Sequence, residues 1–175
     1  MKKVSVLVYM SLFLIVCLAY GNEQAQSGRY ANQHKLSTGL TVVVAEGDFE
    51  PRSIGSYSVR NYGANPDFPT DDFVCGTIRP RDGIVEKVII QDINGNGTEE
   101  IIVIIRSVGT GGYLSADVFQ YQPKQLMLLE SVTDLTKKAD PIHELTKKAA
   151  EKELEGNGDF KVPNAWAIDL PLLHN

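Results

Sequence analysis

The chain has 175 residues, of which 43% are hydrophobic, with 17 basic and 22 acidic side chains. This length suits one domain with an adequate hydrophobic core. The acidic balance argues against nucleic-acid binding, because phosphates favour a basic surface, and it favours a basic protein partner.

The N-terminus has the features of a secretory signal peptide. Lys2 and Lys3 form a short positive region, Val4 to Ala19 is almost wholly apolar, and Ala19 and Gly21 supply small residues at the positions that a signal peptidase reads. We predict a cleaved signal peptide over residues 1–21, because the apolar core is short for a membrane span and precedes a cleavage site. Export follows, with no membrane attachment after processing. The mature chain then carries 15 basic and 22 acidic residues, a net charge of −7.

A polar segment follows the predicted cleavage site. Residues 22–37 are weakly patterned, so we expect a loose N-terminal tail. Residues 38–175 are predicted to form a single domain.

The middle of the chain is a series of short β-rich runs separated by turn-forming residues. This spacing predicts a mainly β protein, an antiparallel β-sandwich. The predicted strands are Leu40–Ala45, Ile54–Tyr62, Phe73–Ile78, Val85–Ile90, Ile101–Ile105, Leu114–Tyr121 and Leu126–Val132.

Cysteine usage excludes an intramolecular disulfide. Cys17 belongs to the predicted signal peptide, so Cys75 is the one cysteine of the mature chain. Its place in a predicted strand favours a buried structural thiol. The alternative is a bridge between two chains, since an unpaired cysteine in an oxidising compartment can pair intermolecularly. Such a bridge, or a surface strand, would support a homodimer.

The connection after Val85–Ile90 has the residue types of a calcium loop. Oxygen-bearing side chains alternate with glycines, which is how a short loop can wrap a hard cation. The simpler interpretation, which we favour, is an Asn/Gly turn between two strands, because few of the early candidate ligands are charged. The candidate Ca²⁺ ligands are Asp92, Asn94, Asn96 and Glu100.

A glycine-rich connection between the next two strands is the most distinctive feature. Ser107–Ser115 contains three glycines, with a hydroxyl at Thr110 and a phenol at Tyr113. The pattern alone favours an ordinary hairpin turn. The alternative is a loop that contacts a partner through these polar tips.

The end of the chain changes to a helical pattern. Asp140 can cap a helix, Pro141 suits its first turn, and Gly156 can end it. We therefore predict a C-terminal helix beside the sandwich. The three histidines are scattered, and no nucleophile signature is present, so we do not expect an enzyme.

Longer stretches of the chain resemble one family, the bacterial periplasmic inhibitors of invertebrate-type (I-type) lysozyme. The resemblance runs from about Thr41 to Leu129 and is carried by Glu46–Arg60, Ile78–Gly83 and Arg106–Asp117. It implies a β-sandwich fold, export, and I-type lysozyme as the partner.

The resemblance also implies the binding site. The family's inhibitory loop carries a Ser-Gly-x-Tyr motif that enters the lysozyme cleft, and the matching residues here are Thr110, Gly111, Gly112 and Tyr113. Thr110 departs from the family's serine; it keeps the hydroxyl and adds a methyl group. Ser56 and Tyr57 are the second choice for the contact residues. The alternative function is an exported calcium- or carbohydrate-binding β module, which rests on the loop Asp92–Glu100.

Overall fold

The computed structural model describes residues 28–154. The predicted signal peptide, residues 1–21, lies outside this range, and so does the end of the predicted domain. No helix within the described range is long and apolar enough to cross a membrane.

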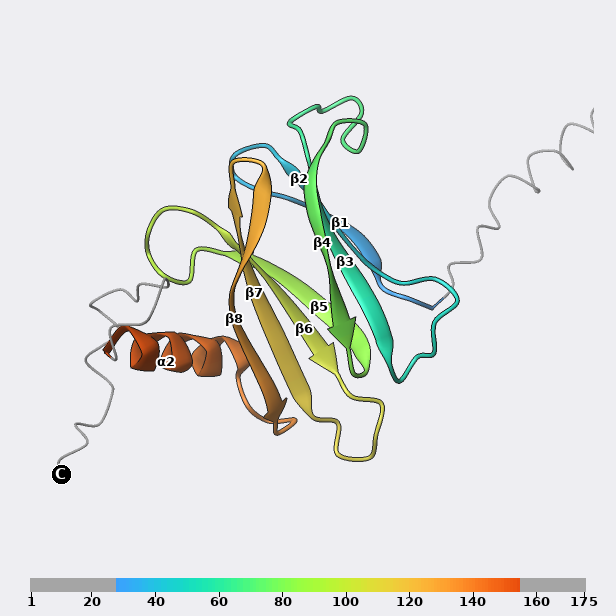
Figure 1. The fold of residues 1–175 in the computed structure, drawn as a ribbon, viewed down its shortest axis with the longest axis vertical. Helices are drawn as coiled ribbons and strands as arrows, with labels where there is room; N and C mark the ends of the chain where they lie inside the picture. The colour runs from blue at the N-terminus through green and yellow to red at the C-terminus, as the bar shows by residue number, and fades with distance from the viewer. Residues whose placement is uncertain (1–27, 155–175) are drawn as a thin grey trace, which may run out of the picture.

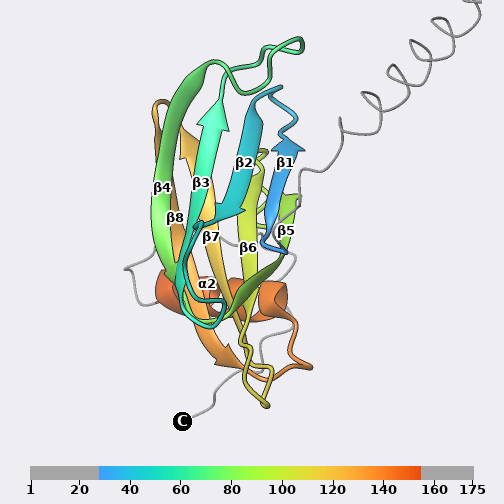
Figure 2. The same ribbon diagram turned by 90° about the vertical axis from the view of Figure 1, so that its right-hand side faces the viewer.

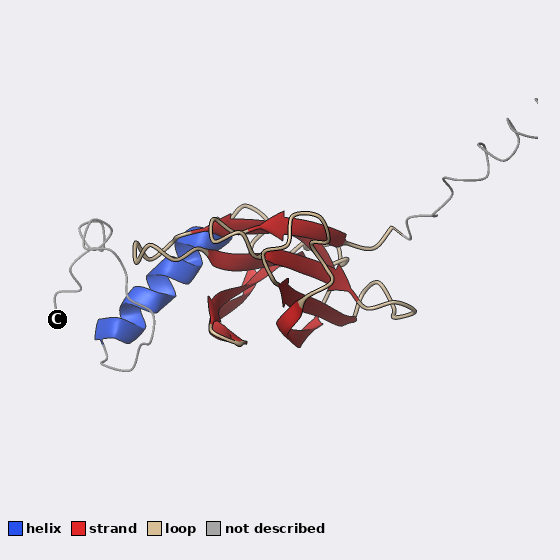
Figure 3. Cartoon of the chain, turned by 90° about the horizontal axis from the view of Figure 1, so that it is seen from above, coloured by secondary structure: helices blue, strands red, loops and turns tan. Residues whose placement is uncertain are grey.

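Eight antiparallel strands form two sheets, which confirms the predicted sandwich (Figures 1 and 3). Every hydrogen-bonded neighbour is also the next strand in sequence, so each sheet is a simple meander. The first sheet contains β1 (Ala31–Lys35), β2 (Thr41–Glu46), β3 (Gly55–Tyr62) and β4 (Phe73–Arg81). The second contains β5 (Ile84–Gln91), β6 (Glu100–Arg106), β7 (Leu114–Gln122) and β8 (Gln125–Leu135).

Strand β1 corrects the expectation of a loose tail over residues 22–37 for its own residues, 31–35, whereas residues 22–27 lie outside the described range. It pairs with β2 over its whole length, from Ala31↔Ala45 to Lys35↔Thr41. Its side chains are mostly exposed, and for this reason its sequence shows no apolar alternation. The strand is held by its backbone ladder and by Leu36, which is buried directly after it.

The core between the sheets follows from two different sequence patterns. Strands β2 and β3 alternate, so Val42, Val44, Tyr57 and Val59 are fully buried while their neighbours face outward. Strand β6 is buried on both faces, which explains its unbroken run of isoleucine and valine.

The helix α2 (Pro141–Leu154) covers the outer face of the second sheet (Figure 2). Its predicted start is confirmed: Asp140 Oδ1 accepts a hydrogen bond from Ile142 N at 3.0 Å, which satisfies a free amide of the first turn. Leu145 and Ala149 pack into a second apolar cluster with the outward residues of β6. The sheet is therefore sandwiched between the first sheet and the helix.

Cys75 is buried with a free thiol, which confirms the prediction of a buried structural cysteine. Burial raises the pKa of this thiol. The thiolate that disulfide exchange requires is therefore disfavoured at this position.

A buried polar network joins the two sheets at one edge. The carboxylate of Asp117 on β7 accepts hydrogen bonds from Tyr57 Oη and Ser131 Oγ, both at 2.5 Å, and from Arg79 Nε at 3.2 Å. Tyr57 and Arg79 belong to the first sheet, whereas Ser131 belongs to the second. Burial raises the pKa of Tyr57 far above its ordinary value, so the phenol remains a donor at every relevant pH.

This network generates a stability prediction. Replacing Tyr57 by Phe removes one donor from the buried Asp117 carboxylate while keeping the ring in the core. We expect Tyr57→Phe to lower the free energy of unfolding by about 1–3 kcal/mol, the cost of a lost buried hydrogen bond to a charged group. Urea unfolding measures this change. Tyr113→Phe, at an exposed tyrosine, is the control and should leave stability unchanged; equal losses in both variants would contradict the role of the network.

Candidate functional site

The glycine-rich connection between β6 and β7, residues 107–113, projects from one end of the sandwich (Figures 1 and 2). It begins directly after the last residue pair of the two strands, Arg106↔Leu114. Thr110 and Gly111 are exposed, and the side chains of Val108 and Tyr113 are about half exposed, at 53% and 52%. The predicted hydroxyl and phenol thus lie together on an accessible loop.

The loop backbone has a defined conformation. Ser107 N donates to Tyr113 O at 2.9 Å, and Gly112 N donates to Gly109 O at 3.1 Å. Gly112 adopts a φ of 55°, in the left-handed region that favours glycine. At Gly111, a Cβ would overlap the ring of Tyr113. The two central glycines therefore allow the turn itself and let the aromatic ring lie against its backbone.

A neighbouring connection at the same end, residues 47–54 between β2 and β3, is organised by Arg81 (Figure 2). The Arg81 side chain has no exposed surface. It donates to the carbonyls of Arg52 at 2.9 Å, Pro51 at 3.1 Å and Ser56 at 3.0 Å. Sequence reasoning missed this residue, because its partners lie far from it along the chain.

Arg81 also fixes the turn between β4 and β5. It donates to the carbonyl of Gly83, whose φ is 128°. A Cβ at Gly83 would overlap the carbonyl of Arg106, so the absence of a side chain lets this turn pack against the start of loop 107–113. Loop 107–113 is therefore supported by the β4–β5 turn as well as by its own strands, β6 and β7.

Ser56 and Tyr57 are the second choice for the contact residues, and this prediction is wrong for Tyr57. This side chain is fully buried, packs edge-on against Phe119 and donates to Asp117. Ser56, on the opposite face of β3, donates from its hydroxyl to Glu50 Oε1 at 2.8 Å and from its amide to Oε2 at 2.5 Å. These hydrogen bonds lower the pKa of Glu50. Adjacent strand residues face opposite sides, so the two side chains cannot act together on one partner.

The comparison with known proteins identifies the family. The family model for periplasmic lysozyme inhibitors of I-type lysozyme matches residues 28–149. The chain belongs to this family. It is therefore a periplasmic inhibitor of I-type lysozyme and not itself an enzyme.

Two solved structures are similar to the inhibitor. PliI-Ah, the periplasmic inhibitor of I-type lysozyme from Aeromonas hydrophila, is 42% identical, with a TM-score of 0.64 over 66% of this chain and 98% of that chain. Aeromonas hydrophila PliI in complex with Meretrix lusoria lysozyme is 44% identical, with a TM-score of 0.63 over 66% of this chain and 94% of that chain. The search of curated proteins found no match.

The candidate calcium loop of the inhibitor is a succession of side-chain-capped turns. Asp92 accepts from Gly95 N at 2.7 Å and from Gly97 N at 2.8 Å. Asn94 and Asn96 each accept from the backbone amide two residues further on. Side chains that bond their own backbone in this way stabilise a turn without an ion. Among the described residues, no group of three or more His, Cys, Asp or Glu could hold a metal ion, and we retain the proposal of a structural turn.

Glu100, the fourth candidate ligand, is fully buried. Its carboxyl group accepts hydrogen bonds from Ile93 N at 2.9 Å, Asn94 Nδ2 at 3.1 Å and Gln120 Nε2 at 3.2 Å. Burial, with a smaller contribution from the Asp92 charge, raises its pKa to about 7. These buried hydrogen bonds anchor the loop Asp92–Glu100 to β6 and β7.

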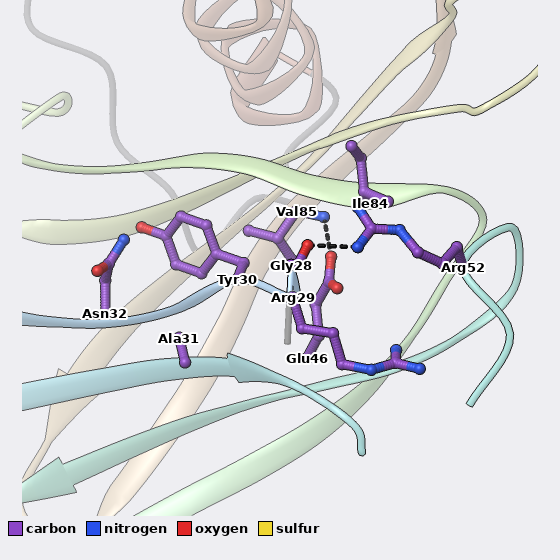
Figure 4. Close-up of a pocket in the computed structure, with 9 residues that line it drawn as sticks. All are labelled: Gly28, Arg29, Tyr30, Ala31, Asn32, Glu46, Arg52, Ile84 and Val85. Atoms are coloured by element: carbon purple, nitrogen blue, oxygen red, sulfur yellow. Dashed lines mark hydrogen bonds between the residues drawn. The ribbon is translucent and has the colours of Figure 1, made fainter. Parts of the chain in front are cut away.

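A pocket of about 250 Å³ lies beside the projecting end of the inhibitor (Figure 4). Glu46 Oε1 accepts from Val85 N at 2.6 Å, and Arg52 donates to the carbonyl of Gly28. These bonds join β2 to β5 and tie the β2–β3 connection to the start of the described chain. The lining residues are Gly28, Arg29, Tyr30, Ala31, Asn32, Glu46, Arg52, Ile84 and Val85.

The raised pKa of Glu100 generates a pH prediction. The folded protein retains a proton on this carboxyl between its ordinary pKa of 4.5 and about 7, whereas the unfolded chain releases it. The free energy of unfolding should therefore fall as pH rises through this range, by up to about 3 kcal/mol. Denaturant unfolding at pH 4.5 to 7.5 measures the slope. Glu100→Gln should flatten it, and an unchanged slope in this variant would rule out Glu100 as its source.

The turn interpretation generates a separate prediction for calcium. The melting temperature and the inhibition of lysozyme should be the same in millimolar Ca²⁺ and in excess chelator, because ligand binding to the folded state alone would raise stability. Differential scanning fluorimetry and a lysis assay measure both quantities. A rise in melting temperature with Ca²⁺ that disappears in Asp92→Ala would show that the loop is an ion site.

Proposed function

We propose that the inhibitor blocks the active-site cleft of I-type lysozyme with loop 107–113. The observation that carries this proposal is the half-exposed Tyr113 ring on a hydrogen-bonded loop at one end of the sandwich. A complex between Aeromonas hydrophila PliI and Meretrix lusoria lysozyme supports the partner class. Because this loop is a narrow projection, it suits a concave partner surface.

The chemistry of the target matches the polar tips of the loop. Glycoside hydrolases of this kind use two carboxyl groups, one protonated and one ionised. The hydroxyls of Thr110 and Tyr113 would donate to the ionised group and exchange hydrogen bonds with the acid. Charge-assisted hydrogen bonds are stronger than neutral ones. Inhibition is then competitive occlusion of the cleft, in which the inhibitor performs no chemistry.

The ordered backbone of the loop contributes to affinity. Binding costs free energy when flexible segments must be immobilised. The hydrogen bonds from Ser107 and Gly112 already fix the loop in the free protein, so less ordering remains for the complex. The Tyr113 ring supplies the large apolar contact expected of an anchor residue. A single copy suffices for this mechanism, and a homodimer stays a separate prediction.

Substitutions at the loop tip test the proposal. Tyr113→Ala should weaken binding to I-type lysozyme by about 2 kcal/mol, or roughly thirtyfold in Kd, as loss of an aromatic anchor does. Thr110→Val should weaken inhibition by removing the hydroxyl, whereas Thr110→Ser should preserve it. Inhibition constants from a cell-wall lysis assay give these differences.

Phe68 provides the matched control. It is exposed to 61% and lies in the connection 63–72 between β3 and β4, at the opposite end of the sandwich (Figure 1). Phe68→Ala should inhibit like the parent protein. If Tyr113→Ala and both Thr110 variants also inhibit like the parent, another surface blocks the cleft.

A further inference from the structure

The last residue of β6 makes contacts beyond its own strand. The guanidinium of Arg106 donates from Nη1 to the carbonyl of Gly112 at 3.1 Å. This carbonyl immediately precedes Tyr113. The same guanidinium contacts Glu86 on β5, with Nε 2.5 Å from Oε2 and Nη2 2.9 Å from Oε1. One side chain therefore connects the tip of loop 107–113 to a neighbouring strand.

The backbone of β5 is irregular at the residue that holds Arg106. Val85 pairs with Ile105 and Lys87 pairs with Ile104, so Glu86 is the extra residue of a β-bulge. Bulges commonly redirect a side chain near functional sites. Here the bulge accompanies a two-point ion pair with Arg106, a geometry that the planar guanidinium matches and an ammonium group cannot.

We propose that Arg106 and Glu86 are positioning residues that preset the carbonyl of Gly112 and, through it, Tyr113 for lysozyme binding. This inference rests on the proposed function of loop 107–113. Glu86 orients the guanidinium, the guanidinium fixes the carbonyl, and the carbonyl fixes the backbone that carries the tyrosine. Neither side chain needs to touch the enzyme.

Arg106 and Glu86 are too exposed for their ion pair to contribute much to the stability of the whole protein. About a third of each side chain is exposed, 35% for Arg106 and 34% for Glu86. Exposed ion pairs contribute little to the stability of the whole protein. Local ordering of a binding loop is a different effect, because it lowers the entropic cost of forming the complex.

Amide hydrogen exchange in the free protein tests the first half of the proposal. The reporters are the amides of Ser107 and Gly112, both hydrogen-bonded within the loop. Arg106→Lys and Glu86→Gln should each speed their exchange by about tenfold, the effect of losing a charge-assisted hydrogen bond, with an unchanged melting temperature. Glu151→Gln, at an exposed residue of α2, is the matched control. Unchanged exchange in both the Arg106→Lys and the Glu86→Gln variants would overturn the proposal.

A double-mutant cycle tests the second half. Arg106→Lys and Glu86→Gln should each weaken inhibition by about tenfold in the parent protein, and have almost no further effect in the Tyr113→Ala background, because they act through that side chain. Full additivity would overturn the proposal and assign Arg106 or Glu86 a direct contact with lysozyme.

The two experiments distinguish a failure of this inference from a failure of the proposed function. If Tyr113→Ala inhibits like the parent, loop 107–113 is not the inhibitory element. Faster exchange at Ser107 and Gly112 would then still support the ordering of the loop by Arg106, and unchanged exchange would still overturn it.

Discussion

The buried guanidinium of Arg81 is the constraint on which the end of the sandwich that carries loop 107–113 depends. It lies at the end of β4 with no exposed surface and donates to carbonyls of the β2–β3 connection and of the β4–β5 turn. Glu50 Oε2 lies 3.6 Å from Arg81 Nη2 and supplies the compensating charge. A buried cation of this kind requires its partners, so the two connections take one arrangement around it.

A series of close contacts connects Arg81 to loop 107–113. Gly83, held by Arg81, packs directly against the backbone of Arg106. Arg106 then bonds the carbonyl of Gly112 at the tip of loop 107–113. The core and the Asp117 network stabilise the sandwich, whereas loop 107–113 exposes Thr110 and Tyr113. This shape suits the proposed mechanism, in which the loop acts as a fixed projection and needs no reactive group.

The sequence predicted those features that depend on local patterns. Alternating or continuous apolar runs located seven strands, and Asp140 with Pro141 located the helix start. Strand β1 escaped prediction because an exposed edge strand has neither an apolar face nor a characteristic composition. Loop 107–113 was evident from its glycines, although the pattern alone did not distinguish a contact loop from a plain turn.

The support of the site could not be predicted, because it consists of contacts between distant residues. Arg81 bonds carbonyls about thirty positions earlier, and Glu86 reaches Arg106 from another strand through a bulge. No local pattern specifies such pairs. Tyr57 was misassigned because an aromatic beside a serine gives no indication of which face of the strand it occupies, whereas its register in β3 places it in the core.

The central claim is that one end of the sandwich, and loop 107–113 above all, enters the lysozyme cleft. Hydrogen–deuterium exchange of the inhibitor, alone and saturated with I-type lysozyme, tests this most directly. The account predicts the strongest slowing of exchange in residues 107–113, and none in the connections 63–72 and 92–99 at the other end of the strands (Figure 1). Slowing at those two connections, with exchange in 107–113 unchanged, would contradict it.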